Sequence, residues 1–183
     1  MLAAATDILV EEGRDSFTVA RVCERAGVAP TVIYRRVEGI LGLFWAVYEE
    51  GMRPIMLEQR RQLERARGLP VGTGERVHFV IEAAGATFES NLRFLTPVMR
   101  YATGDAAMSE RGSPESFEMV SLIEELLDDG DEEAAHDVAR MVHSECAMRA
   151  LYGPRWLEGA PENFDAFIRR MERMALARLS IET

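Results

Sequence analysis

The stretch "FTVARVCERAGVAPTVIYRR", residues Phe17 to Arg36, contains two short runs of apolar residues at three- and four-residue spacing. This spacing places apolar side chains on one face of a helix and therefore predicts two consecutive helices. Thr18 is expected to cap the first helix, and Pro30 suits the first turn of the second, where a missing amide costs nothing. Between them, Gly27 can adopt the positive φ that redirects the chain.

Two short helices joined by a glycine-containing turn form a helix-turn-helix, whose second helix enters the major groove of DNA. Val32 and Ile33 are expected to face inward and the polar residues around them outward. Arginine can bond guanine or phosphate, and threonine can contact phosphate or a thymine methyl group. The predicted DNA-binding residues are Thr18, Ala29, Pro30, Thr31, Tyr34, Arg35 and Arg36. The alternative is a plain helical corner, with Tyr34 in the core and the arginines on a solvated surface.

The rest of the chain repeats the helical spacing and has no convincing alternating run, so the predicted fold is all-α. At 183 residues the chain can bury a full core. We expect a helix-turn-helix DNA-binding domain over residues 1–45 and a larger helical ligand-binding and dimerisation domain over residues 46–183. The expected helices are 3–13, 18–26, 30–37, 40–67, 75–90, 91–103, 114–129, 131–152 and 161–180.

The net charge is −10, and all 21 basic residues are arginines. Residues 105–137 hold 12 acids and one arginine, so the rest of the chain is nearly neutral. Because nucleic acid responds to the charge of the face that it meets, the acidic total does not exclude DNA. Cys23 and Cys146 stand alone and are expected to be buried thiols. No secretory or membrane-spanning segment is evident, so a cytoplasmic location is expected.

Residues Leu2 to Tyr48, about a quarter of the chain, resemble the DNA-binding domain of the TetR (tetracycline repressor) family of bacterial transcriptional regulators. The resemblance is carried by Ala3–Gly13, Thr18-Val19, Ala26-Gly27-Val28, Ile33-Tyr34 and Leu41–Trp45. It implies a ligand-responsive regulator, a repressor released by a small hydrophobic effector. It also implies a homodimer formed through the last two helices and a palindromic operator in double-stranded DNA.

The resemblance places an effector pocket among the middle helices. Large, soft side chains suit a pocket that must accept several shapes, although the same stripes also build ordinary cores. The predicted ligand-binding residues are Trp45, Met52, Phe79, Phe88, Phe94, Met99, Tyr101, Phe117, Met141 and Met148. Glu145 and Arg149, one helical turn apart, are interpreted either as a polar anchor or as a surface pair.

Three positions depart from the family pattern. Val32 and Ile40 replace residues that commonly contact phosphate, and Glu38 would face a polyanion. No basic segment precedes the first helix of this sequence. These departures predict weak or unusually sequence-dependent DNA binding. They leave open a degenerate family member that acts as a helical ligand- or protein-binding dimer without DNA binding.

No motif for enzymatic activity stands out, and we expect neither catalytic residues nor a cofactor. Glu133-Ala-Ala-His136 occurs once, whereas carboxylate di-metal bundles need the motif twice. His136 and His143 lie seven residues apart on one predicted helix and lack a third ligand. The sequence therefore predicts no metal site and a protein that is not an enzyme.

Overall fold

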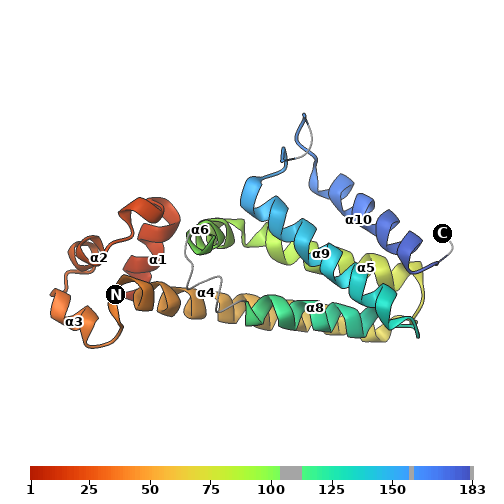
Figure 1. Cartoon of the computed structure of the whole chain (residues 1–183), viewed down its shortest axis with the longest axis horizontal. Helices are drawn as coiled ribbons and strands as arrows, with labels where there is room; N and C mark the ends of the chain where they lie inside the picture. The colour runs from red at the N-terminus through yellow and green to blue at the C-terminus, as the bar shows by residue number, and fades with distance from the viewer. Residues whose placement is uncertain (104–112, 157–158, 182–183) are drawn as a thin grey trace. The chain divides into compact units, whose positions relative to one another are not determined.

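The computed structural model describes residues 1–103, 113–156 and 159–181, and within these ranges it contains helices and no strand (Figure 1). The predicted all-α fold is confirmed. The α-helices are α1 (Leu2–Glu11), α2 (Val19–Ala26), α3 (Pro30–Tyr34), α4 (Gly39–Glu64), α5 (Gly74–Ser90), α6 (Leu92–Ala102), α8 (Pro114–Leu127), α9 (Glu132–Tyr152) and α10 (Phe164–Arg178). Two 3₁₀ turns, η1 (Arg14–Ser16) and η2 (Arg65–Gly68), follow α1 and α4.

Side-chain caps set the start of most of these helices. In each case the side-chain oxygen accepts a hydrogen bond from the backbone amide three residues later, which satisfies a donor that the first turn leaves free. The capping residues are Thr18, Thr73, Ser113, Asp131 and Asn163. Several predicted ends were too late: for example, α3 stops at Tyr34 and not at residue 37, and α4 tightens into η2 after Glu64.

The described chain packs as two compact units. Unit 1 comprises residues 1–55 and 93–111, and unit 2 comprises residues 56–92 and 112–183. The α4 helix contributes residues to both units. Residues of α6 belong to unit 1 because Val98 and Tyr101 are buried in its core. The predicted division into a DNA-binding domain over residues 1–45 and a ligand-binding and dimerisation domain over residues 46–183 stays a prediction.

Unit 1 has an aromatic core. The ring of Tyr101 lies stacked on that of Phe44, with centroids 4.2 Å apart, and Phe17 meets Tyr101 edge to face at 5.5 Å. Such pairs add about 0.5–1.5 kcal/mol each beyond the apolar area that they bury. The contacts fasten α6 to α4 and to the segment that precedes α2.

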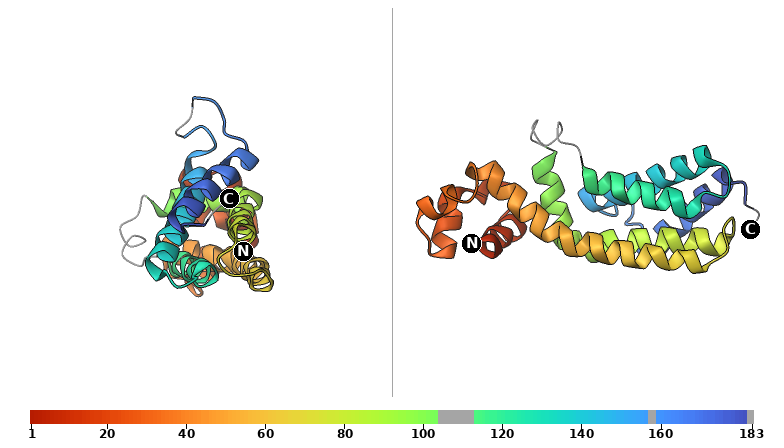
Figure 2. Two further views of the ribbon diagram at one scale, coloured as in Figure 1. Left: turned by 90° about the vertical axis from the view of Figure 1, so that its right-hand side faces the viewer. Right: turned by 90° about the horizontal axis from the view of Figure 1, so that it is seen from below.

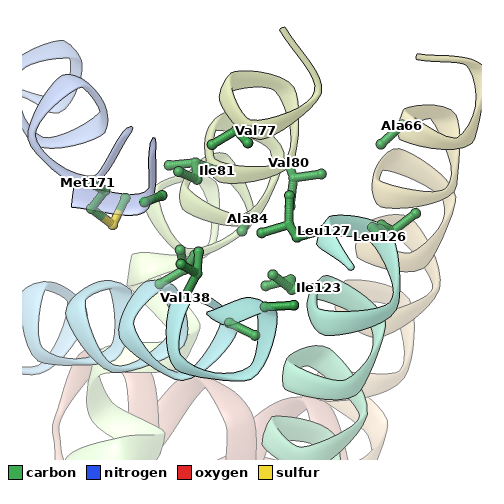
Figure 3. Packing of buried hydrophobic residues seen from close by; sticks show 14 of the residues in the cluster. Ala66, Val77, Val80, Ile81, Ala84, Ile123, Leu126, Leu127, Val138 and Met171 are labelled. Carbon is green, nitrogen blue, oxygen red and sulfur yellow. The ribbon is translucent and has the colours of Figure 1, made fainter. Parts of the chain in front are cut away.

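Unit 2 is built on α5, which packs against both α9 and α10, while α8 and α9 form a helical hairpin (Figure 2). Its core is aliphatic, with Val80, Ile81 and Ala84 of α5 facing Ile123 and Val138 (Figure 3). None of the helices in the described ranges is long and apolar enough to cross a membrane.

Gly51 of α4 marks a close approach within unit 1. A Cβ atom added there would lie 2.0 Å from Cζ of Phe94. Real Cβ contacts are far longer, so the ring occupies the volume that any side chain at this position would need. Gly51 thus lets Phe94 pack directly against the backbone of α4.

We expect Gly51→Ala to destabilise unit 1. Alanine favours a helix interior over glycine by about 1 kcal/mol, but displacing the Phe94 ring costs about 1–3 kcal/mol, so the clash should prevail. Urea unfolding measures the difference. Gly68→Ala is the control, because nothing lies within 4 Å of its Cβ position. A Gly51→Ala protein as stable as the control would contradict this packing.

Candidate nucleic-acid interface

The segment from Thr18 to Arg36 forms two helices joined by a tight turn. The α2 helix begins after Thr18, whose hydroxyl accepts from the amide of Arg21 at 3.2 Å. It ends at Gly27, which has φ 64° and ψ 34°. The amide of Val28 then donates to the carbonyl of Cys23 at 3.1 Å, a helix-closing bond that the left-handed glycine permits. The predicted positive φ at Gly27 is confirmed.

The short α3 helix is held by one fully buried side chain. Ile33 is 0% exposed and belongs to the core of unit 1. Val32 and Val28 are partly buried. Pro30 occupies the first turn, as predicted. Because α3 spans only five residues, the burial of Ile33 determines which of its side chains face outward.

Every predicted DNA-binding residue is exposed. Tyr34 is 61% exposed, so it does not belong to the core, as a plain helical corner would require. Exposure makes these side chains available to a partner but does not show contact with DNA, so their role stays a prediction. The exposed residues are Thr18, Ala29, Pro30, Thr31, Tyr34, Arg35 and Arg36.

The arginines of α2 are paired with acids at the C-terminal end of α1. Arg21 contacts Glu12 at 3.0 Å, and Arg25 contacts Glu11 at 2.7 Å and Glu12 at 3.0 Å. The hydrogen bond from Arg21 holds the pKa of Glu12 below its usual value and raises the pKa of Arg21. Two of the bases nearest the turn are thus already paired.

Arg35 and Arg36 differ from them. Within residues 1–103, 113–156 and 159–181, neither guanidinium makes an ion pair or a hydrogen bond. Both are exposed and follow directly on α3. Glu38, also exposed, lies two residues further on. The end of α3 therefore presents two uncompensated cations with one carboxylate beside them.

The predicted ligand-binding residues do not gather in one described cavity. Tyr101 is only 7% exposed and is held in the aromatic stack of unit 1, whereas Phe117 is 75% exposed. The set stays a prediction. Its unit 1 members are Trp45, Met52, Phe94, Met99 and Tyr101, and its unit 2 members are Phe79, Phe88, Phe117, Met141 and Met148.

Unit 2 contains a pocket of about 270 Å³ where α9 ends and α10 begins. Arg149 lies over the ring of Phe167, 4.9 Å from its centroid, and donates to the carbonyl of Glu162 at 3.1 Å. Of the predicted ligand residues, Met148 is the one that lines it. The lining consists of Glu145, Met148, Arg149, Gly153, Pro154, Trp156, Glu162, Phe167 and Arg170.

Glu145 and Arg149 do not pair with each other. Glu145 accepts from Arg170 at 3.0 Å, and Arg149 lies 3.3 Å from Glu89. These partners come from α10 and α5, and helical spacing along α9 cannot reveal them. Sequence reasoning therefore missed Glu162, Trp156 and Arg170, which lie far along the chain from α9 or in the loop after it.

The histidines of α9 have separate surroundings. Nδ1 of His136 lies 2.9 Å from a carboxylate oxygen of Glu124. His143 meets the ring of Phe88 edge to face at 5.9 Å, and its burial lowers its pKa. No cluster of three or more metal-binding side chains occurs among the described residues.

The chain thus combines an N-terminal helix-turn-helix, a motif whose second helix enters the major groove in DNA-binding proteins, with a larger all-helical unit. Residues 1–46 match the family model described as "Bacterial regulatory proteins, tetR family". Over residues 1–46 the chain is thus similar to the tetR family, which confirms the resemblance in the sequence.

Solved structures of regulators described as TetR-like or TetR/AcrR share the fold over nearly the whole chain. A TetR-like transcriptional regulator from Rhodococcus sp. RHA1 is 16% identical, with a TM-score of 0.65 over 99% of this chain and 94% of its own. A TetR/AcrR family regulator from Thermobifida fusca YX-ER1 is 17% identical, with a TM-score of 0.62 over 96% and 93%. No curated protein matches the chain in sequence.

We expect Glu12→Gln to weaken unit 1 at neutral pH. The lowered pKa of Glu12 means that its ion pairs stabilise the fold above the unfolded-state pKa of about 4.3 and lose that effect as the pH falls through the lower native value. The difference between variant and wild type in urea midpoint should therefore be present at pH 7 and shrink below about pH 4. The exposed, unpaired Glu38, changed to Gln, serves as control; an equal shift there would contradict the pairing.

Proposed function

We propose that the chain is a homodimeric, ligand-responsive transcriptional regulator that binds operator DNA through α3. The observation that carries the proposal is the pair of exposed guanidinium groups at Arg35 and Arg36. Neither has a carboxylate partner in the described chain, whereas Arg21 and Arg25 do. An arginine free of intramolecular pairs can bond a phosphate or the edge of guanine without first breaking a salt bridge.

The dimer of the proposal forms through α9 and α10. Supporting it, large apolar side chains remain exposed on these helices and on the loop that joins them. They are Met148, Tyr152, Trp156 and Met174. A two-fold dimer would set two copies of α3 about one turn of DNA apart, roughly 34 Å. The operator would then be palindromic.

In the proposed mechanism, the protein represses until a small hydrophobic molecule enters the larger domain. The effector must bind one conformation of the dimer more tightly than the other, a difference typically worth about 1–3 kcal/mol. The α4 helix is suited to carry the change, because one continuous helix contributes residues to both units.

A second candidate is a family member that has lost DNA binding. Glu38 favours it, because its exposed carboxylate lies two residues from Arg36 and would repel a polyanion. Such a protein would keep the dimer and the effector site. Measurement of DNA affinity separates the two candidates directly.

We expect Arg35→Ala combined with Arg36→Ala to abolish selective DNA binding while the dimer persists. Loss of two phosphate or base contacts should lower affinity at least tenfold and reduce the salt slope by about two if both contact phosphate. Fluorescence anisotropy against the DNA upstream of the gene, at several salt concentrations, measures both quantities.

The matched control is Arg60→Ala combined with Arg61→Ala. It removes an adjacent arginine pair of the same charge, but one whose members are bound to Glu118 and Glu58. Equal losses of DNA affinity in the two double variants would mean that the effect comes from net charge alone. Wild-type protein that binds random and upstream duplexes alike would favour the candidate without operator recognition.

A further inference from the structure

Unit 2 buries one polar group that has no partner. Gln59 of α4 is 3% exposed, and its Nε2 makes no hydrogen bond within the described residues. Arg76, the other buried polar or charged side chain of the described chain, donates to the carbonyls of Leu126 and Leu69 at 2.6 and 2.9 Å. The core thus satisfies a guanidinium and leaves an amide unsatisfied.

Gln59 interrupts an apolar stripe. On α4 it stands between Ile55, 8% exposed, and Leu63 and Ala66, both 0% exposed. The spacing of four, four and three residues keeps these side chains on one helical face. A buried donor without an acceptor costs about 1–3 kcal/mol. A leucine at this position would avoid that cost. Buried polar groups in native proteins nearly always have hydrogen-bond partners, so we expect the Nε2 donor of Gln59 to have an acceptor.

Ion pairs fix what lies opposite Gln59. Arg60 of α4 pairs with Glu118, and Arg67 of the following η2 turn pairs with Glu125 at 2.9 Å, so both pairs reach α8 at the same offset of 58 residues. The two helices therefore run parallel in this register. By the same offset Gln59 is level with residue 117, which is within one helical turn of Met119, a core residue that is 4% exposed.

The neighbouring helices supply further soft side chains. His136 pairs with Glu124 across the α8–α9 hairpin, Met119 of α8 belongs to the core cluster of unit 2, and Met141 of α9 packs against that cluster. On α5, Phe88 packs against the same core cluster as Met141. The core of unit 2 thus includes methionines, which adapt readily to an inserted apolar body, beside a phenylalanine.

The charged groups around Gln59 indicate which type of group can accept a hydrogen bond from its amide. Arg76 is the buried cation of the described chain, and it donates to the carbonyl of Leu126, near the C-terminal end of α8, and to that of Leu69. Burial lowers the pKa of His143, whose ring contacts Phe88, and so disfavours its charged form. A buried carboxylate here would lack a counter-charge and pay a large desolvation cost. A neutral oxygen can accept the Gln59 hydrogen bond without that cost.

We propose that the Gln59 amide anchors the effector by donating from Nε2 to a neutral acceptor oxygen, such as a ketone, ester or amide carbonyl, on an otherwise apolar molecule. The inference rests on the proposed function, since it deepens the description of the same effector. It adds a polar specificity determinant on α4 to a site whose other members are apolar. Because α4 contributes to both units, a bond to Gln59 acts directly on the helix suited to carry the response.

The test uses three probes of similar size: butylbenzene, which has no acceptor, butyrophenone, which has a ketone, and phenylbutyrate, which has a carboxylate. Calorimetric titration of the full chain measures their affinities. We expect butyrophenone to bind wild type about fivefold to tenfold more tightly than butylbenzene, the worth of one hydrogen bond. Phenylbutyrate should bind most weakly.

Two variants isolate the amide. Gln59→Leu should bind butyrophenone and butylbenzene equally, and its urea midpoint without probe should be higher than that of wild type because an unpaired donor is gone. Gln62→Leu is the matched control on the same helix, since that glutamine is partly exposed and donates to Glu58. It should keep the wild-type preference for the ketone.

Several results would overturn the proposal. They are no preference of wild type for the ketone, a preference that survives in Gln59→Leu, failure of all three probes to bind, or a lower midpoint of Gln59→Leu without probe, which indicates an amide satisfied by buried water. DNA anisotropy on the same variants keeps the two proposals apart. Intact operator binding without a ketone preference would contradict only the proposed role of Gln59. A ketone preference without DNA binding would contradict only the proposed function as a regulator.

Discussion

The burial of Ile33 is the constraint on which the rest of the account depends. A helix of five residues has almost no stability of its own, so its position follows from what anchors it. Ile33 supplies that anchor from within α3, and the left-handed turn at Gly27 sets the direction in which the chain reaches it. With these two points fixed, Tyr34, Arg35 and Arg36 face solvent.

Charge pairing then separates structural arginines from available ones. Acids at the C-terminal end of α1 pair with Arg21 and Arg25, which stiffens the contact between α1 and α2 and lowers the positive charge of that face. The charges of Arg35 and Arg36 are not compensated, because neither guanidinium pairs with a carboxylate of the described chain. An acidic protein can in this way present a small cationic site, which a whole-chain charge of −10 conceals.

Local signals made the helices predictable. Thr18 and Gly27 announce the two ends of α2 because a hydroxyl cap and a positive φ are properties of single residues. Pairings between helices were not predictable in the same way. Glu145 was matched with Arg149 along one helix, yet packing gives Glu145 to Arg170 of α10 and Arg149 to Glu89 of α5.

The candidate DNA interface lay within the reach of the sequence, since helical periodicity around Ile33 decides which neighbours face outward. The effector site could not be predicted from the sequence in the same way. Ten soft residues were selected by type, and the structure distributes them over two units. Gln59 escaped notice because a glutamine among polar neighbours on a long helix looks like surface, and only its burial with an unpaired amide distinguishes it from Gln62.

Arginine-specific modification with phenylglyoxal, mapped by mass spectrometry with and without upstream DNA, tests the central claim most directly. We expect Arg35 and Arg36 to be modified rapidly in the free protein, because they are exposed and unpaired. Both residues should be protected when the duplex is added. Equal modification of these two residues in both conditions, with protection found at arginines of unit 2 instead, would contradict the assignment of α3 as the DNA-binding helix.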